Sequence, residues 1–176
     1  MAGRALTGVL LVGGASRRFG SPKALARLNG RTLAEIGWET LAFCDERIAV
    51  GKAADGLELP FPILDDGTET RAPIAGVVAA LRAARHDVCV VLPVDTPLVD
   101  RDALIALVDA CADAAVPQTG PLPGAYRRSA LPALERALAS GRLALRHALF
   151  GLDVARLELD PALLVNANTP EELARL

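Results

Sequence analysis

The amino-acid sequence predicts an α/β protein with a mostly parallel, twisted sheet covered by helices, and three observations support this class. Short apolar runs alternate with segments of helical spacing from residue 6 to about residue 111, as in right-handed β-α-β units. Val88–Leu92 is apolar throughout and mostly β-branched, which is the pattern of a strand buried on both faces. Hydrophobic residues make up 52% of the chain but aromatic residues only 3%, so we expect a core of Leu, Val and Ala.

Length and composition limit the possible functions. A chain of 176 residues fits one domain, over residues 1–176. The formal net charge of -2 predicts neither a nucleic-acid nor a membrane partner, and no apolar stretch is long enough to span a bilayer. The three cysteines are far apart and form no C-x-x-C pair, which disfavours a zinc site or a disulfide framework. We therefore expect a cytoplasmic protein with reduced thiols.

The first predicted element is a strand over residues 6–12, and a long, glycine-rich, basic loop follows it. The glycines and cations of this loop are Gly13, Gly14, Arg17, Arg18, Gly20 and Lys23. In open α/β sheets ligands bind at the carboxyl ends of the strands, and backbone N–H groups in such a turn can hold an anion. The glycine spacing matches neither the P-loop nor the dinucleotide motif. An ordinary basic surface loop is the alternative, but the strand before the glycines favours a triphosphate site.

The next elements follow from capping and periodicity. Thr32 and Glu35 form a capping box, and helical spacing continues from there to Cys44. Strands are expected over residues 47–50 and 61–64, with a polar loop or weak helix between them. Pro73 begins a helix with one apolar stripe to residue 84. Gly76 in its first turns fits helix packing and close approach of a ligand equally well.

The second half of the chain is less regular. Asp100 caps a helix that carries apolar residues as far as Cys111. Short strands over 114–117 and 124–127 could pair, and helices are expected over 129–139 and 142–150. Residues 154–159 alternate as an edge strand does. A final helix begins after Thr169, with Pro170 in its first position and Glu172 completing a capping box.

Asp95 is the most informative acidic residue. It follows the most buried strand directly, so it should lie at the same sheet edge as the basic loop. A carboxylate beside a triphosphate would hold Mg²⁺, a hard cation that takes oxygen ligands and keeps several waters. The alternative, an aspartate that begins a turn, is weaker because Asp100 already caps the next helix.

Other polar residues have simpler alternatives. Asp65 and Asp66 end another strand at this edge and could bind metal or nucleotide, or form an acidic turn. Asn166 and Asn168 could bind the substrate, or form Asx turns and caps. Arg127 and Arg128 could meet a second anionic substrate, but a solvated basic pair is the stronger expectation. Tyr126 and Trp38 are expected to pack rather than to stack on a base, and the cysteines Cys44, Cys89 and Cys111 to lie in the core rather than to act as nucleophiles.

Four motifs in order resemble the nucleotidyltransferase family that includes the molybdenum cofactor guanylyltransferases. The first is G-G-x-S-x-R-x-G-x-x-K, here Gly13–Lys23. The others are Pro73-Ile74-Ala75-Gly76, Pro93-Val94-Asp95-Thr96-Pro97 and the closing Val165-Asn166-Ala167-Asn168-Thr169-Pro170. The family usually has Ala where this chain has Val12. It also commonly has an Asn after the second strand, and this Asn is missing around Gly51-Lys52, which bears on the expected contacts with the base. Val12-Gly13-Gly14, where cytidylyltransferases tend to have Ala-Ala-Gly, favours GTP over CTP.

The resemblance implies a three-layer, Rossmann-like nucleotidyltransferase domain that joins GTP to the phosphate of molybdopterin and releases pyrophosphate. The implied nucleotide-binding residues are Leu11, Val12, Gly13, Gly14, Lys23, Asp66 and Asp95. It also implies that Asp95 binds Mg²⁺ associated with the nucleotide. As a mechanistic hypothesis, this Mg²⁺ and the cations Lys23 and Arg18 would neutralise the charge that develops toward pyrophosphate. Other proteins of cofactor synthesis, or apo-molybdoenzymes, are the implied transient partners. The alternatives are a cytidylyltransferase, another NTP transferase acting on a phosphorylated small molecule, and a non-catalytic nucleotide-binding module.

Overall fold

The computed structural model describes residues 5–13 and 22–176 and confirms the predicted α/β class. Seven strands form one sheet in the order β5-β4-β1-β6-β8-β7-β9, and a two-stranded ribbon, β2-β3, lies outside it. The strands of the main sheet are β1 (Leu6–Leu11), β4 (Glu46–Gly51), β5 (Ile63–Asp65), β6 (Val88–Pro93), β7 (Ala114–Pro117), β8 (Gly124–Arg127) and β9 (Val154–Leu157). The helices are α1 (Leu33–Thr40), α2 (Pro73–Ala83), α3 (Arg101–Ala110), α4 (Leu131–Ala139), α5 (Leu145–Ala148) and α6 (Pro170–Leu173).

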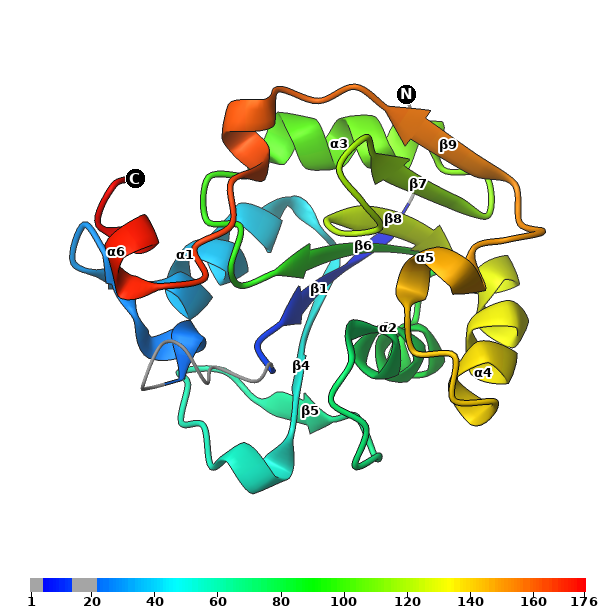
Figure 1. Cartoon of the computed structure of the whole chain (residues 1–176), viewed down its shortest axis with the longest axis horizontal. Coiled ribbons are helices and arrows are strands. Elements are labelled where there is room, and N and C mark those ends of the chain that lie inside the picture. The colour runs from blue at the N-terminus through cyan, green and yellow to red at the C-terminus, as the bar shows by residue number, and fades with distance from the viewer. Residues whose placement is uncertain (1–4, 14–21) are drawn as a thin grey trace.

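The parallel half of the sheet comprises β5, β4, β1 and β6, and β1 pairs with both β4 and β6. β8 joins β6 antiparallel, and β7 pairs antiparallel with β8, as the sequence predicted for residues 114–117 and 124–127. β9 forms the outer edge, parallel to β7. β5, β4, β1 and β6 therefore end at the same edge of the sheet, and Figure 1 shows β1 beside β6.

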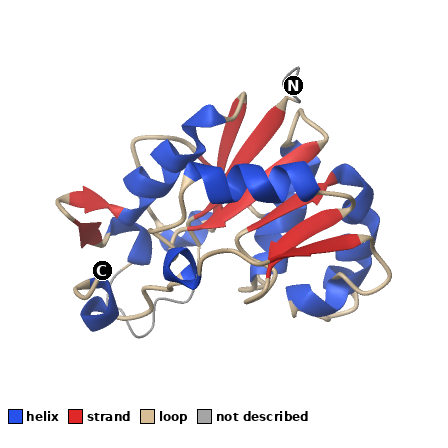
Figure 2. Cartoon of the chain, turned by 90° about the horizontal axis from the view of Figure 1, so that it is seen from above, coloured by secondary structure: helices blue, strands red, loops and turns tan. Residues whose placement is uncertain are grey.

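Side chains on β1 alternate between two cores, one on each face of the sheet. Leu10 packs with buried residues of α1 and α3, whereas Val9 and Leu11 pack with α2 and α4. The helices accordingly cover both faces, with α1 and α3 on one side and α2 and α4 on the other (Figures 1 and 2). The core is almost entirely aliphatic, as the composition predicted.

Several predicted boundaries need correction. The first helix ends at Thr40 and a short 3-10 turn, Leu41–Phe43, leads into β4, because the apolar spacing to Cys44 spans two elements. The helix expected over 142–150 shortens to α5. The ribbon of β2 (Arg27–Leu28) and β3 (Arg31–Thr32) was not predicted; Asn29 and Gly30 turn it with positive φ angles. The caps at Thr32, Asp100 and Thr169 are confirmed, but Glu172 does not complete a capping box at α6, because its carboxylate accepts from the Asn168 N–H and not from the Thr169 N–H.

The aromatic residues and the cysteines pack as expected. The rings of Trp38 and Phe61 stack with centroids 4.1 Å apart, and Tyr126 is fully buried with its hydroxyl donating to the Pro121 carbonyl. Burial raises the thiol pKa of Cys44 and of Cys89 to about 12, so neither is a ready nucleophile at neutral pH. Across the two described ranges, no helix is both long and apolar enough to cross a membrane.

Candidate functional site

A cavity of about 390 Å³ opens at the carboxyl ends of β1, β4 and β6. Its walls include the predicted Leu11, Val12 and Gly13, together with Asp66 and Asp95. The chain approaches itself closely here, since a Cβ added to Gly13 would lie 3.3 Å from the Gly51 Cα. Gly76 fills its expected role in helix packing, since an added Cβ would lie 2.8 Å from Leu11 Cδ2, and it also lines the cavity. Gly14 and Arg18 lie outside the described residues.

Lys23 and Asp95 meet in this cavity although 72 residues separate them in the sequence. The Lys23 Nζ donates to Asp95 Oδ2 at 3.1 Å, and the two side chains are 18% and 27% exposed. Lys23 begins a 3-10 turn, Lys23–Leu25, while Asp95 sits in the turn that follows β6. The Val94 N–H donates to the Leu11 carbonyl at 3.0 Å, which ties that turn to the end of β1. The structure therefore confirms that the two residues converge.

The closing Asn-x-Asn segment completes this cluster. The Lys23 Nζ also donates to Asn168 Oδ1 at 2.8 Å, and the Ala167 N–H donates to the Asp95 carbonyl at 2.8 Å. Asn166 lines the cavity. The Asn168 side chain thus contacts the lysine, where the sequence suggested a contact with substrate. Its backbone N–H donates to Glu172 Oε2 at 2.7 Å, so the same residue also helps to begin α6.

We expect Asn168→Ala to lower kcat/KM for pyrophosphate release about tenfold, because Lys23 loses one of the acceptors that fix its ammonium. The backbone contact with Glu172 survives the substitution, so the melting temperature should change little. Thr169→Ala is the matched control: it removes the α6 cap, costing about 1 kcal/mol of stability, but leaves Lys23 untouched. An Asn168→Ala enzyme with wild-type kcat/KM would show that Lys23 does not depend on this contact.

A second lysine–aspartate pair, which the sequence did not reveal, lies on another wall of the same cavity. Lys52 directly follows β4, and its Nζ donates to Asp66 Oδ1 at 2.7 Å. The side chains are only 10% and 7% exposed. One sequence feature could have identified Lys52 as a candidate site residue: it immediately follows a strand, at the edge where open α/β sheets bind ligands. The sequence did not indicate its partner, since Asp66 is 14 residues away.

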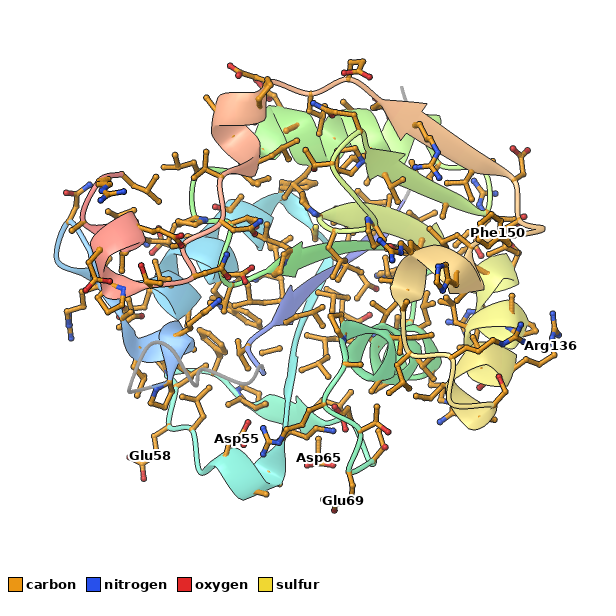
Figure 3. The ribbon with its side chains drawn as sticks, viewed as in Figure 1. Asp55, Glu58, Asp65, Glu69, Arg136 and Phe150 are labelled. Atoms are coloured by element: carbon orange, nitrogen blue, oxygen red, sulfur yellow. The ribbon has the colours of Figure 1, made fainter. Side chains whose placement is uncertain are left out.

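The two neighbouring aspartates have different roles. Asp66 faces the cavity, whereas the Asp65 carboxylate accepts from the backbone N–H groups of Ala53 and Gly67. These two hydrogen bonds, first that of Ala53, lower the pKa of Asp65. Asp65 lies beside the 3-10 turn that contains Asp55 (Figure 3). Asp65 therefore belongs to an acidic turn, which was the alternative given in the sequence analysis, whereas Asp66 contributes to the cavity.

Arg127 and Arg128 lie away from the cavity. Arg127 pairs with Val88, the first residue of β6, whereas the cavity lies beyond the last residue of that strand. The Arg127 guanidinium donates to the Cys111 carbonyl and lies 3.6 Å from Asp87, and the Arg128 guanidinium donates to the Ala84 carbonyl. Both therefore act in packing between elements at the opposite edge of the sheet, not on an anionic substrate in the cavity.

Comparison with known proteins finds similar sequences over most of the chain. The family described as the MobA-like NTP transferase domain matches residues 8–154. A probable molybdenum cofactor guanylyltransferase of Bacillus subtilis is 32% identical, with 96% of this chain and 92% of the relative covered. A molybdenum cofactor guanylyltransferase of Desulfosudis oleivorans is 31% identical, with 97% and 94% covered.

Solved structures show the same architecture. Molybdopterin-guanine dinucleotide biosynthesis protein A from Archaeoglobus fulgidus superposes with a TM-score of 0.82 and 29% identity, covering 96% of this chain and 95% of that one. A 2-C-methyl-D-erythritol 4-phosphate cytidylyltransferase from Thermus thermophilus has a TM-score of 0.73 and 23% identity, with 95% of each chain covered. The latter likeness concerns the fold alone.

Proposed function

This chain belongs to the family of MobA-like NTP transferases, and we propose that it transfers GMP from GTP to the phosphate of the molybdopterin cofactor, releasing pyrophosphate. The observation that carries the proposal is the meeting of Lys23 and Asp95 in a cavity lined by Gly13 at the strand ends. The relatives named as molybdenum cofactor guanylyltransferases support the choice of GTP and of the acceptor.

The transfer needs no covalent intermediate with the protein. An oxygen of the acceptor phosphate forms a bond to the α-phosphorus of GTP, and the bond from that phosphorus to the β-phosphate oxygen breaks. Pyrophosphate leaves with the electron pair. A phosphate monoester is already ionised at neutral pH, so positioning and charge stabilisation supply the catalysis. The Lys23 ammonium would bind the phosphates of the nucleotide, and Arg18 in the same loop stays a sequence-based proposal for added charge.

Asp95 fits the role of a magnesium ligand. Among the described residues no group of three or more His, Cys, Asp or Glu side chains could hold a metal by itself. Mg²⁺ at nucleotide sites is usually bound by one or two carboxylates together with substrate phosphates and waters, so a lone carboxylate beside a triphosphate site suits it. The ion would supply charge neutralisation on the phosphates when bound. The Asp95 carboxylate accepts from the Lys23 ammonium, and the Asp95 carbonyl accepts from the Ala167 N–H, so both the side chain and its turn are held in place.

A pyrophosphate-release assay tests the proposal. The full chain is given GTP, CTP, ATP or UTP, each combined with molybdopterin or with a sugar phosphate, in the presence of Mg²⁺. We expect release with GTP and molybdopterin far above every other pair. Release with CTP or with a sugar phosphate instead would identify a different transferase of this fold. Nucleotide binding without release in any combination would identify a non-catalytic module.

A further inference from the structure

Both lysines of the chain lie in the candidate site. The sequence contains 19 basic residues, and only Lys23 and Lys52 are lysines; the others are arginines. Each lines the cavity and each forms an ion pair with one aspartate, Asp95 for Lys23 and Asp66 for Lys52. A lysine ammonium is a compact charge with three donors on a flexible stem, whereas a guanidinium is a flat fork. The residue type thus suits a point where several acceptors converge from different directions.

Lys52 meets such a convergence. Its Nζ donates to Asp66 Oδ1 at 2.7 Å, to the Thr70 carbonyl at 2.7 Å and to the Thr68 carbonyl. An ammonium group has three N–H donors, so these contacts use all of them. Lys52 therefore has no donor left for a nucleotide phosphate. Its contacts instead fold the segment 66–70 onto the end of β4, where the Asp66 N–H also donates to the Gly51 carbonyl at 3.1 Å.

The same contacts orient the Asp66 carboxylate. Oδ1 accepts from the Lys52 Nζ and, at 3.1 Å, from the Thr68 N–H. Oδ1 is thereby held within the protein, and Oδ2 is the oxygen left for a ligand in the cavity that Asp66 lines. A carboxylate this buried is costly without a cation beside it. Lys52, which lines the same cavity, supplies that cation.

We infer that Lys52 is a positioning residue for base selection, holding Asp66 and the segment 66–70 as the wall that distinguishes guanine from other bases; this rests on the proposed use of GTP. An ionised carboxylate can only accept hydrogen bonds. The pairing edge of guanine presents two adjacent N–H donors, which suit such an acceptor. The corresponding edges of cytosine and adenine place an unprotonated ring nitrogen next to the amino group, and this nitrogen is repelled by a carboxylate.

The test compares Lys52→Met with the wild type for GTP and CTP, measuring kcat and KM of pyrophosphate release and the melting temperature. We expect the KM for GTP to rise about tenfold or more and kcat to stay within about threefold, the pattern of lost binding without lost chemistry. The ratio of kcat/KM for GTP to that for CTP should fall about tenfold, since Asp66 is no longer held. A purely structural ion pair would lower the melting temperature without changing this ratio.

Arg85→Met is the matched control, because it removes an ion pair from the opposite end of β4, where Arg85 Nε lies 2.8 Å from Glu46 Oε1. Its GTP-to-CTP ratio should equal that of the wild type. A folded Lys52→Met protein with wild-type KM and selectivity overturns the inference.

Asp66→Asn and the double variant Lys52→Met/Asp66→Asn keep the inference testable if Lys52→Met does not fold, because the double variant buries no unpaired charge. If Lys52 acts through Asp66, adding Lys52→Met to Asp66→Asn should change the KM for GTP by about threefold or less. A full tenfold change in that background contradicts the inference.

Calorimetric binding of GTP and CTP to the same proteins, without acceptor, separates the two proposals. A wild type that prefers GTP in binding but releases no pyrophosphate would overturn the proposed function and leave the role of Lys52 testable. Wild-type turnover of GTP together with an unchanged binding preference in Lys52→Met would overturn the role of Lys52 alone.

Discussion

Replacing Lys23 with alanine is expected to lower kcat for pyrophosphate release on the order of 10²–10³-fold, the usual effect of removing one charged group from a preorganised site. The ammonium lies 3.1 Å from Asp95 Oδ2 and 2.8 Å from Asn168 Oδ1, so its position is fixed before any substrate arrives. Its removal takes away positive charge where pyrophosphate develops. The measurement is kcat and KM with saturating molybdopterin and Mg²⁺.

The Lys23→Ala protein should remain folded, because the Lys23 side chain is partly exposed and forms no part of the aliphatic core. Arg82→Met is the control for loss of a cation outside the site, since Arg82 Nε lies 2.7 Å from Glu135 Oε1 in an exposed pair. Such exposed pairs contribute little to stability. Its turnover should match the wild type. Wild-type-like turnover in a folded Lys23→Ala protein would remove the proposed mechanism.

Asp95→Asn is expected to lower kcat at a fixed Mg²⁺ concentration on the order of 10²-fold, because a neutral amide replaces the carboxylate proposed to bind the ion. The substitution keeps the size of the side chain and the backbone contact between the Asp95 carbonyl and the Ala167 N–H. The Mg²⁺ concentration that gives half-maximal rate should rise. A Mg²⁺ titration of initial rates measures both effects, with EDTA giving the metal-free rate.

Asp100→Asn is the matched control for Asp95→Asn. Asp100 caps α3 by accepting from the Ala103 N–H at 2.9 Å, and asparagine is as good a cap as aspartate. The control therefore loses one carboxylate from the same segment of the chain, outside the residues that line the cavity, without losing structure, and its Mg²⁺ titration should follow that of the wild type. If Asp95→Asn keeps the wild-type rate and the wild-type Mg²⁺ dependence, Asp95 is not the metal ligand.

Capping residues and the spacing of apolar residues predicted most helices and strands correctly. They failed where one apolar pattern runs through two elements. The helix predicted from Thr32 began correctly because its capping box is a contact between residues three apart. Its end was wrong because Leu41 and Cys44 continue the spacing of α1 while belonging to the turn that leads into β4. The β2-β3 ribbon was missed since two-residue strands have no periodicity to detect.

The candidate residues at strand ends could also be predicted from local sequence. Leu11, Asp66 and Asp95 each follow or end a parallel strand, and parallel strands of adjacent β-α-β units end at one edge. The edge was thus predictable, whereas the partners across it were not. Lys52 is 14 residues from Asp66, and Asn168 is 145 residues from Lys23. No periodic or capping rule relates residues at such separations.

The sequence alone determined the α/β class, the helix caps, the sheet edge at which the candidate site lies and the family resemblance, because each depends on short-range spacing or on the composition of single segments. Only the tertiary structure decided which side chains meet at that edge. It added Asn168 to the expected meeting of Lys23 with Asp95, paired Lys52 with Asp66, and placed Arg127 at the opposite edge. The physical reason is that strand order and the packing of loops bring together groups whose separation along the chain carries no signal.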